Sequence, residues 1–216
     1  MSARADILAR LRGAVAGSDR VTRQAAAEAR LLAAARGPQP VLPPDGRLRF
    51  QQRAVAQACT VDAVAGWASV PAAVASYLET HDLGTVAVAT PDLAAIDWAS
   101  AGLRVACRGA VDADQVGISG CFCAIAETGT LLLLSGPQTP ATVSLLPETH
   151  VTLVDSRRIV ATMEDAFALL RAEHGQLPRA VNFVSGPSRT GDIEQTIVLG
   201  AHGPCRVHLI LIGETV

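Results

Sequence analysis

The chain has 216 residues, of which half are apolar and 18% are charged, and its formal net charge at pH 7 is −2. This length suits one domain with a sizeable core, and the apolar content excludes disorder over most of the chain. The small negative charge and the 3% aromatic content argue against nucleic acid as a partner, because they provide little phosphate attraction or base stacking.

All 18 basic residues are arginine, because the sequence contains no lysine. Schiff-base catalysis, a pyridoxal-phosphate lysine and a Walker-type phosphate-binding lysine are therefore excluded. The first residues carry charges at Arg4, Asp6 and Arg10 instead of the apolar stretch of a secretory signal. The apolar runs elsewhere are shorter than the roughly 20 residues that a membrane helix needs. We therefore expect a cytoplasmic protein without a membrane span.

The N-terminal part is predicted to be a helical arm. Residues 3–16 and 21–36 are rich in alanine and arginine and predict two helices with a thin apolar stripe. Residues 37–46 contain four prolines, which is typical of an extended, semi-rigid connector. These patterns predict an arm with its linker over residues 1–46 and a folded domain over residues 47–216.

The domain is predicted to alternate helices and strands. Predicted helices cover residues 49–59, 71–81, 91–101 and 161–175, and predicted strands cover residues 60–66, 85–90, 103–108, 150–156, 180–184 and 205–212. Thr162 is the expected cap of the last helix and Gly175 its expected end. Residues 116–136 predict a strand, a tight turn at residues 127–130 and a second strand. This alternation favours an α/β fold with a mainly parallel sheet and flanking helices.

The turn Glu127-Thr-Gly-Thr130 carries the only charge between Asp114 and Glu148. Two readings of Glu127 remain open. Backbone N–H groups can satisfy its carboxylate, with Gly129 supplying a positive φ to the turn. Alternatively, the carboxylate lies in a cleft with a raised pKa and takes part in chemistry.

A second polar segment, Ser-Gly-Pro-Ser-Arg-Thr-Gly-Asp-Ile-Glu at residues 185–194, follows a predicted strand. Its turn N–H groups, two hydroxyls and Arg189 would make a cradle for a small anion, because the planar guanidinium suits a carboxylate or phosphate. Arg189 could equally pair with Asp192 or Glu194 and hold its own loop.

His202 lies between two glycines in Gly200-Ala-His-Gly-Pro204, just before the last predicted strand. It is either a general acid or base or a turn residue with a backbone hydrogen bond. The histidines and the five cysteines lack metal-ligand spacing, and the Cys121-Phe-Cys123 pair is wrongly spaced for a zinc or iron–sulfur site. We expect reduced core cysteines and neither a metal nor another cofactor.

Three ordered segments, Ala124–Gly136, Asn182–Glu194 and Gly200–Pro204, together resemble the LUD-domain family, and closely its lactate-utilisation protein C group. The resemblance covers roughly residues 47–215 and does not extend to the alanine-rich arm. It implies a fold similar to the NagB/RpiA/CoA-transferase-like proteins. It carries over to this chain only the motif positions: Glu127, Thr128, Gly129 and Thr130; Gly186, Ser188, Arg189, Thr190, Asp192 and Glu194; and His202.

The resemblance also implies a role in a bacterial three-protein system that oxidises L-lactate to pyruvate. This chain would be the cluster-free subunit, binding a small anion or a partner at the motifs, with iron–sulfur subunits as partners and a homo-oligomer as a further option. One alternative is a stand-alone enzyme similar to CoA-transferases or sugar-phosphate isomerases, using Glu127 as nucleophile or base. The other is an assembly subunit whose motifs only shape turns. If the three loops leave one edge of the parallel sheet, Glu127, Arg189 and His202 should face one cleft.

Overall fold

A computed structural model describes residues 3–15, 19–33, 35–193 and 196–213. The chain divides into two compact units, residues 1–40 and residues 41–216. Among the described residues, no helix is both long enough and apolar enough to cross a membrane.

The first unit consists of the two predicted helices, α1 (Ala3–Val15) and α2 (Arg20–Ala33). Asp19 precedes α2 and its carboxylate accepts a hydrogen bond from the backbone N–H of Thr22, at 2.9 Å. No residue of α2 is buried, and Leu31 and Leu32 are among its exposed apolar side chains. Helices of this length are marginal in water without a packed face.

Removal of residues 1–40 is expected to leave a cooperatively melting domain. Among the described residues, the apolar clusters of the second unit begin at Phe50, so the deletion removes none of these cluster residues. Differential scanning calorimetry of the full and shortened chains checks this expectation. Loss of the melting transition in the shortened chain would show that the arm belongs to the folded domain.

The second unit is built around a six-stranded sheet in the order β1-β12-β7-β4-β2-β3. Its strands are β1 (Thr60–Val64), β2 (Val86–Ala89), β3 (Arg104–Cys107), β4 (Val116–Gly120), β7 (Thr149–Asp155) and β12 (Arg206–Ile212). Every neighbouring pair is parallel, which confirms the predicted α/β fold. The central strands are buried on both sides, as continuous apolar parallel strands require.

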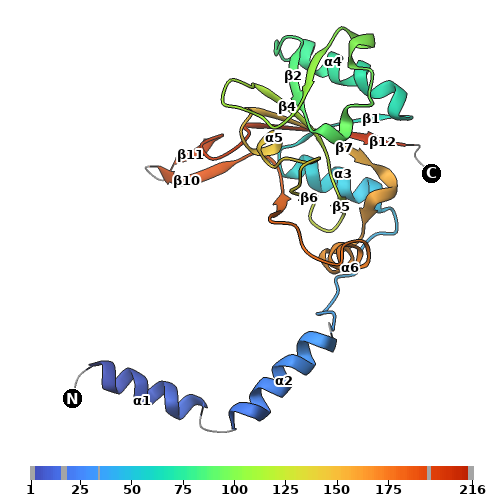
Figure 1. Ribbon diagram of the computed structural model, residues 1–216. Helices are drawn as coiled ribbons and strands as arrows, with labels where there is room; N and C mark the ends of the chain where they lie inside the picture. The colour runs from blue at the N-terminus through green and yellow to red at the C-terminus, as the bar shows by residue number, and fades with distance from the viewer. Residues whose placement is uncertain (1–2, 16–18, 34, 194–195, 214–216) are drawn as a thin grey trace. The chain divides into compact units, whose positions relative to one another are not determined.

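Different layers cover the two faces of the six-stranded sheet (Figure 1). One face packs against α4 (Val70–Thr80), which η1 (Trp67–Ser69) precedes, and against the short turns η2 (Pro91–Leu93) and η3 (Trp98–Ala101). The other face packs against α3 (Gly46–Ala56) and a second sheet. Strand β12 shows the alternation: Ile210 joins the first cluster, whereas Leu209 and Leu211 join the second.

The second sheet is mixed and has the order β8-β5-β6-β9. It consists of β5 (Cys123–Ile125), β6 (Thr130–Leu134), β8 (Ile159–Val160) and β9 (Val181–Val184). The helix α6 (Met163–Glu173) packs on this sheet, α5 (Thr142–Leu145) joins β6 to β7, and η4 (Ser156–Arg158) joins β7 to β8. A separate antiparallel pair, β10 (Arg189–Ile193) and β11 (Thr196–Leu199), extends away from both sheets (Figure 1).

Three predicted segments differ from the structure. Residues 189–193, predicted as part of the polar loop after residue 184, form the strand β10, because they pair with β11. The helix predicted over residues 91–101 is two short 3₁₀ turns, η2 and η3, because the Asp97 carboxylate accepts from Ser100 N and starts a new turn there. The single strand predicted before the turn at residues 127–130 is two strands, β4 and β5. The chain leaves the parallel sheet after Gly120 and enters the mixed sheet at Cys123.

Candidate functional site

The Glu127–Thr130 segment forms the turn between the antiparallel strands β5 and β6. Gly129 has a φ of 71°, in the left-handed region that favours glycine. A Cβ atom at this position would lie 2.5 Å from the backbone nitrogen of Ala54, so the turn packs directly on α3. The guanidinium of Arg53 donates a hydrogen bond to the Glu127 carbonyl at 3.3 Å. Gly129 is therefore explained by packing against α3.

The Glu127 carboxylate lies at the start of α6. Its Oε2 accepts a hydrogen bond from the backbone N–H of Met163 at 3.4 Å, and the side chain is half-buried. Thr162 and Asp165 form a reciprocal capping box at the same helix end. A carboxylate at a helix N-terminus is stabilised by the helix dipole and by free N–H groups. This contact supports a positioning role of Glu127 for α6 more directly than a role in chemistry.

A chain of hydroxyl groups joins the first motif to the second. Thr128 Oγ1 lies 2.7 Å from Thr130 Oγ1, which in turn lies 2.7 Å from Ser185 Oγ. Thr130 is 3% exposed, so this chain is partly closed off from water. The strands β5 and β9 both run antiparallel to β6, so their carboxyl ends meet at one edge of the mixed sheet.

The loop after β9 packs on the end of α3. Gly186 has a φ of 85°, and a Cβ atom there would lie 2.1 Å from the Gln57 carbonyl oxygen. Arg189 is exposed, and its Nη2 donates a long hydrogen bond of 3.5 Å to the same carbonyl. Burial raises the pKa of the nearby Cys59 thiol to about 11, and the positive charge of Arg189 opposes that shift.

Backbone hydrogen bonds join the third motif, residues 200–204, to the second motif, residues 185–194. The backbone N–H of Ser188 donates to the Pro204 carbonyl at 2.9 Å, and Gly200 N–H donates to the Ser188 carbonyl at 3.0 Å. His202 is exposed and lines a shallow depression of about 420 Å³ with, among others, Leu145 and Glu148. Neither Glu127 nor Arg189 lines that depression.

The three motif loops are thus linked, but not at the edge that the sequence suggested. The first two loops leave the mixed sheet, whereas the third precedes β12 and lies at the amino end of the parallel sheet. Thr190 is buried in β10, and the side chains of Asp192 and Glu194 lie outside the part of the chain whose side chains are described. A cleft shared by Glu127, Arg189 and His202 stays a prediction.

A separate cavity of about 260 Å³ opens at the carboxyl ends of β2 and β4. Its walls come from the ends of these two strands, from β6 and β9 of the mixed sheet, and from the segment that leads into α5. The lining residues are Thr90, Asp92, Ser119, Gly120, Cys121, Phe122, Leu133, Leu134, Thr139, Pro140, Ala141, Ser144, His174 and Asn182. The sequence did not point to this cavity, although carboxyl ends of parallel strands are where α/β proteins bind ligands.

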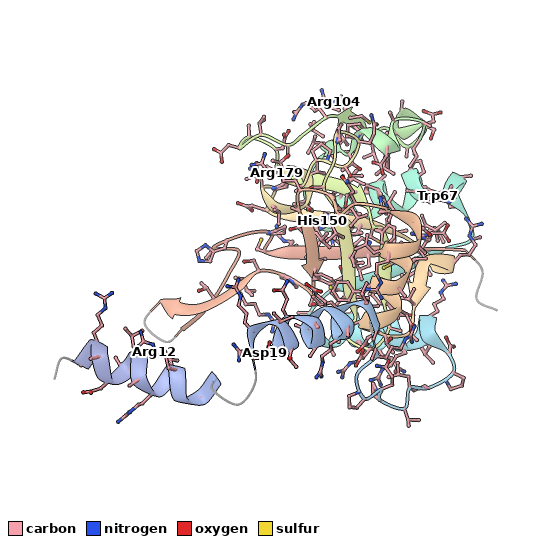
Figure 2. All side chains as sticks on the ribbon, turned by 60° about the horizontal axis from the view of Figure 1, so that its bottom comes forward. Arg12, Asp19, Trp67, Arg104, His150 and Arg179 are labelled. Carbon is pink, nitrogen blue, oxygen red and sulfur yellow. The ribbon has the colours of Figure 1, made fainter. Side chains whose placement is uncertain are left out.

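A buried polar group lies behind this cavity. Ser119 Oγ lies 2.8 Å from His150 Nε2, and Thr152 Oγ1 lies 3.1 Å from the same nitrogen. Figure 2 shows His150 at the centre of the domain, and its side chain is fully buried. Burial lowers the pKa of His150 to about 4, so the imidazole is neutral at physiological pH.

All five cysteines are free thiols. Burial raises the pKa of Cys121, which lines the cavity, to about 12, so its thiolate is not available as a nucleophile at neutral pH. Within the described residues, no group of three or more histidine, cysteine, aspartate or glutamate side chains could hold a metal ion.

Comparison with known proteins gives a consistent assignment. The family model of the LUD domain matches residues 55–212. Lactate utilization protein C of Bacillus subtilis is 36% identical over 103 residues, which are 46% of this chain and 43% of that protein. Lactate utilization protein C of Exiguobacterium is 32% identical over 121 residues, 55% of this chain and 53% of that protein. An uncharacterized protein of Neisseria meningitidis serogroup B is 42% identical over 90 residues, 42% of this chain and 39% of that protein.

The chain therefore spans about half the length of the curated relatives it matches. Among solved structures, the crystal structure of a DUF162 family protein from Deinococcus radiodurans is similar, with a TM-score of 0.62 and 25% sequence identity. The match covers 81% of this chain and 100% of that chain.

Proposed function

The chain belongs to the LUD domain family, and from this premise we propose that it is the cluster-free subunit of a bacterial system that oxidises L-lactate to pyruvate. The observation that carries the proposal is the family match over residues 55–212, together with relatives named Lactate utilization protein C at about 36% identity. The five scattered cysteines of the sequence support the cluster-free role, since their spacing suits no iron–sulfur motif. Electrons would then pass through partner subunits that carry such clusters.

We place the contact with a small anion or with a partner at the loop of Gly186, Ser188 and Arg189. Arg189 is exposed, and its long bond to the Gln57 carbonyl uses one of five N–H donors of the guanidinium. Its planar fork suits a carboxylate such as that of lactate. The bond to the end of α3 would hold the guanidinium in place before the anion arrives.

A second candidate function is that of an assembly subunit whose motifs only shape turns. The close approach of Gly129 and Gly186 to α3 favours it, because both glycines are explained by packing alone. The enzyme alternative with Glu127 as nucleophile or base has weaker support, because the carboxylate is engaged by the N-terminus of α6.

Arg189→Ala is expected to abolish or strongly reduce lactate oxidation while leaving the melting temperature nearly unchanged. Loss of one charge-assisted hydrogen bond, worth about 1.5–3 kcal/mol, weakens binding by one to two orders of magnitude. The chain would be co-expressed with the partner subunits, and lactate oxidation would be measured with the wild-type chain, with each variant and without the chain.

Arg104→Ala is the matched control, because Arg104 is an exposed arginine on the edge strand β3 (Figure 2). Wild-type oxidation by the Arg189→Ala assembly would refute the anion contact and favour the assembly subunit. Equal oxidation with and without the chain would refute the lactate role altogether. Arg189→Lys separates charge from geometry, since lysine keeps the charge but lacks the planar fork.

A further inference from the structure

The cavity at the ends of β2 and β4 contains an unpaired buried hydroxyl. Thr90 is 2% exposed, and its Oγ1 has no hydrogen-bond partner among the described residues. Its backbone is fixed, because Thr90 N–H donates to the Ile118 carbonyl of β4 at 3.0 Å. Buried polar groups in native proteins almost always have a partner, so Thr90, a residue of the cavity lining, has hydrogen-bonding capacity that no described residue uses.

A second hydroxyl lines the same cavity from the neighbouring strand. Ser119 is 3% exposed, and its Oγ is held 2.8 Å from His150 Nε2. A serine hydroxyl has one donor and two acceptor positions, so this contact leaves capacity for a ligand on the cavity side. Thr90 and Ser119 therefore contribute two hydroxyl-bearing side chains to the lining of one cavity.

The remaining walls give the cavity its charge and its apolar side. Phe122, Leu133, Leu134 and Pro140 supply an apolar wall. Among the described residues, the titratable lining groups are Asp92, Cys121 and His174, and none of the lining residues is an arginine. Asp92 is the one carboxylate among the described lining residues, and a carboxylate repels an anion and accepts hydrogen bonds from ligand hydroxyls.

We propose that this cavity binds a small uncharged molecule with at least two hydroxyl groups and one apolar side. Thr90 and Ser119 bind the hydroxyls, Asp92 accepts from one of them, and the apolar side packs on Phe122 and the leucines of β6. The volume of about 260 Å³ is near the lower end of small-molecule pockets. This site is separate from the Arg189 loop and does not depend on the lactate proposal.

The test compares (S)-propane-1,2-diol with L-lactate, which share a carbon skeleton and differ in one CH₂OH or carboxylate group. Each probe is titrated in the millimolar range into the isotope-labelled full chain without partner subunits, and amide shifts are followed by NMR. At the cavity, followed through the shifts of Gly120 and Asn182, the diol is expected to bind at least about tenfold more tightly than lactate.

Thr90→Val and Ser119→Ala are each expected to weaken diol binding about tenfold, as the loss of one hydrogen bond predicts. Asp92→Asn is expected to reduce the difference in affinity between the diol and lactate, because it removes the negative charge that repels lactate. Thr85→Val is the control, since Thr85 precedes the amino end of β2 and lines a different depression. If Thr90→Val fails to fold, the proposal is tested by the diol affinity of Ser119→Ala and by the location of the diol-induced shifts in the wild type.

Three results would overturn the proposal. They are an absence of diol-induced shifts, diol-induced shifts located away from the cavity, and lactate binding at the cavity itself, seen as shifts at Gly120 and Asn182, as tight as diol binding. None of them bears on lactate oxidation by the assembled subunits, so failure here is distinguishable from failure of the proposed function.

Discussion

Gly186→Ala is expected to lower the free energy of unfolding by about 2–5 kcal/mol. Two effects add at this position. A φ of 85° is unfavourable for alanine, at about 1–2 kcal/mol. In addition, the new Cβ would lie 2.1 Å from the Gln57 carbonyl oxygen at the end of α3, so the loop or the helix must move, at about 1–3 kcal/mol.

Gly84→Ala separates these two effects. Gly84 has a φ of 70°, but a Cβ there would meet nothing within 4 Å. It should therefore show only the backbone cost of about 1–2 kcal/mol. Gly129→Ala should resemble Gly186→Ala, because its Cβ would lie 2.5 Å from α3 backbone atoms.

Urea-induced unfolding of the three variants measures the difference. A Gly186→Ala chain that fails to fold where Gly84→Ala folds agrees with the expectation. Equal losses in Gly186→Ala and Gly84→Ala would mean that the loop does not pack on α3 as described.

The parts of the fold that could be predicted are those set by local pattern. Helix α6 is an example, because Thr162 caps it through a capping box with Asp165 that is visible as residue spacing. The strands β7 and β12 were predictable as continuous apolar runs, and their alternation with helices indicated a parallel sheet.

The mixed sheet could not be predicted, because its pairing is non-local. Strand β5 pairs with β8, although β7 lies between them in the sequence. Strand β6 pairs with β9, although α6 lies between them in the sequence. The short runs at residues 121–125 and 159–160 carry no signal that distinguishes this sheet from the parallel one. The expectation that the motif loops share the edge of the parallel sheet was wrong for this reason.

The motif residues could be recognised as candidate site residues from the sequence, whereas the cavity residues could not. Residues 185–194 stand out because glycine, proline, hydroxyls and charges are concentrated in one segment. Thr90, Ser119 and His150 are single polar residues at or within three separate apolar strands. Only the strand order, with β2 beside β4 and β4 beside β7, brings these three residues together.

The stability of the domain is expected to fall between pH 6.5 and pH 5, above the range in which carboxylates titrate. Burial lowers the pKa of His150 and of His208 to about 4 each. His208 is 1% exposed, stacks on the Tyr77 ring at 3.8 Å and lies 2.8 Å from Thr60 Oγ1. Both imidazoles are therefore neutral in the folded state throughout this range.

The direction of the stability change follows from the number of protons that the folded and unfolded chains bind. Below the ordinary histidine pKa of about 6.5 the unfolded chain takes up protons that the folded chain does not, so acid favours unfolding. For each histidine that stays neutral in the folded state, the free energy of unfolding falls by up to about 1.4 kcal/mol per pH unit. Between pH 6.5 and pH 5 this amounts to about 2 kcal/mol for each histidine. The two histidines should contribute about equally, because the pKa of each is lowered to about 4. The pKa values of Asp114, Asp155 and Glu173 are held low by arginine partners, so these groups act only at lower pH.

Urea unfolding at pH 7, 6 and 5 measures the slope. His150→Gln should be less stable than the wild type at pH 7 but should lose less stability on acidification, because one titrating group has been removed. His202→Gln is the control for the substitution itself, since His202 is exposed. A slope in His150→Gln equal to that of the wild type would show that His150 is protonated in the folded domain. The neutral contact between its Nε2 and Ser119 would then have to be abandoned.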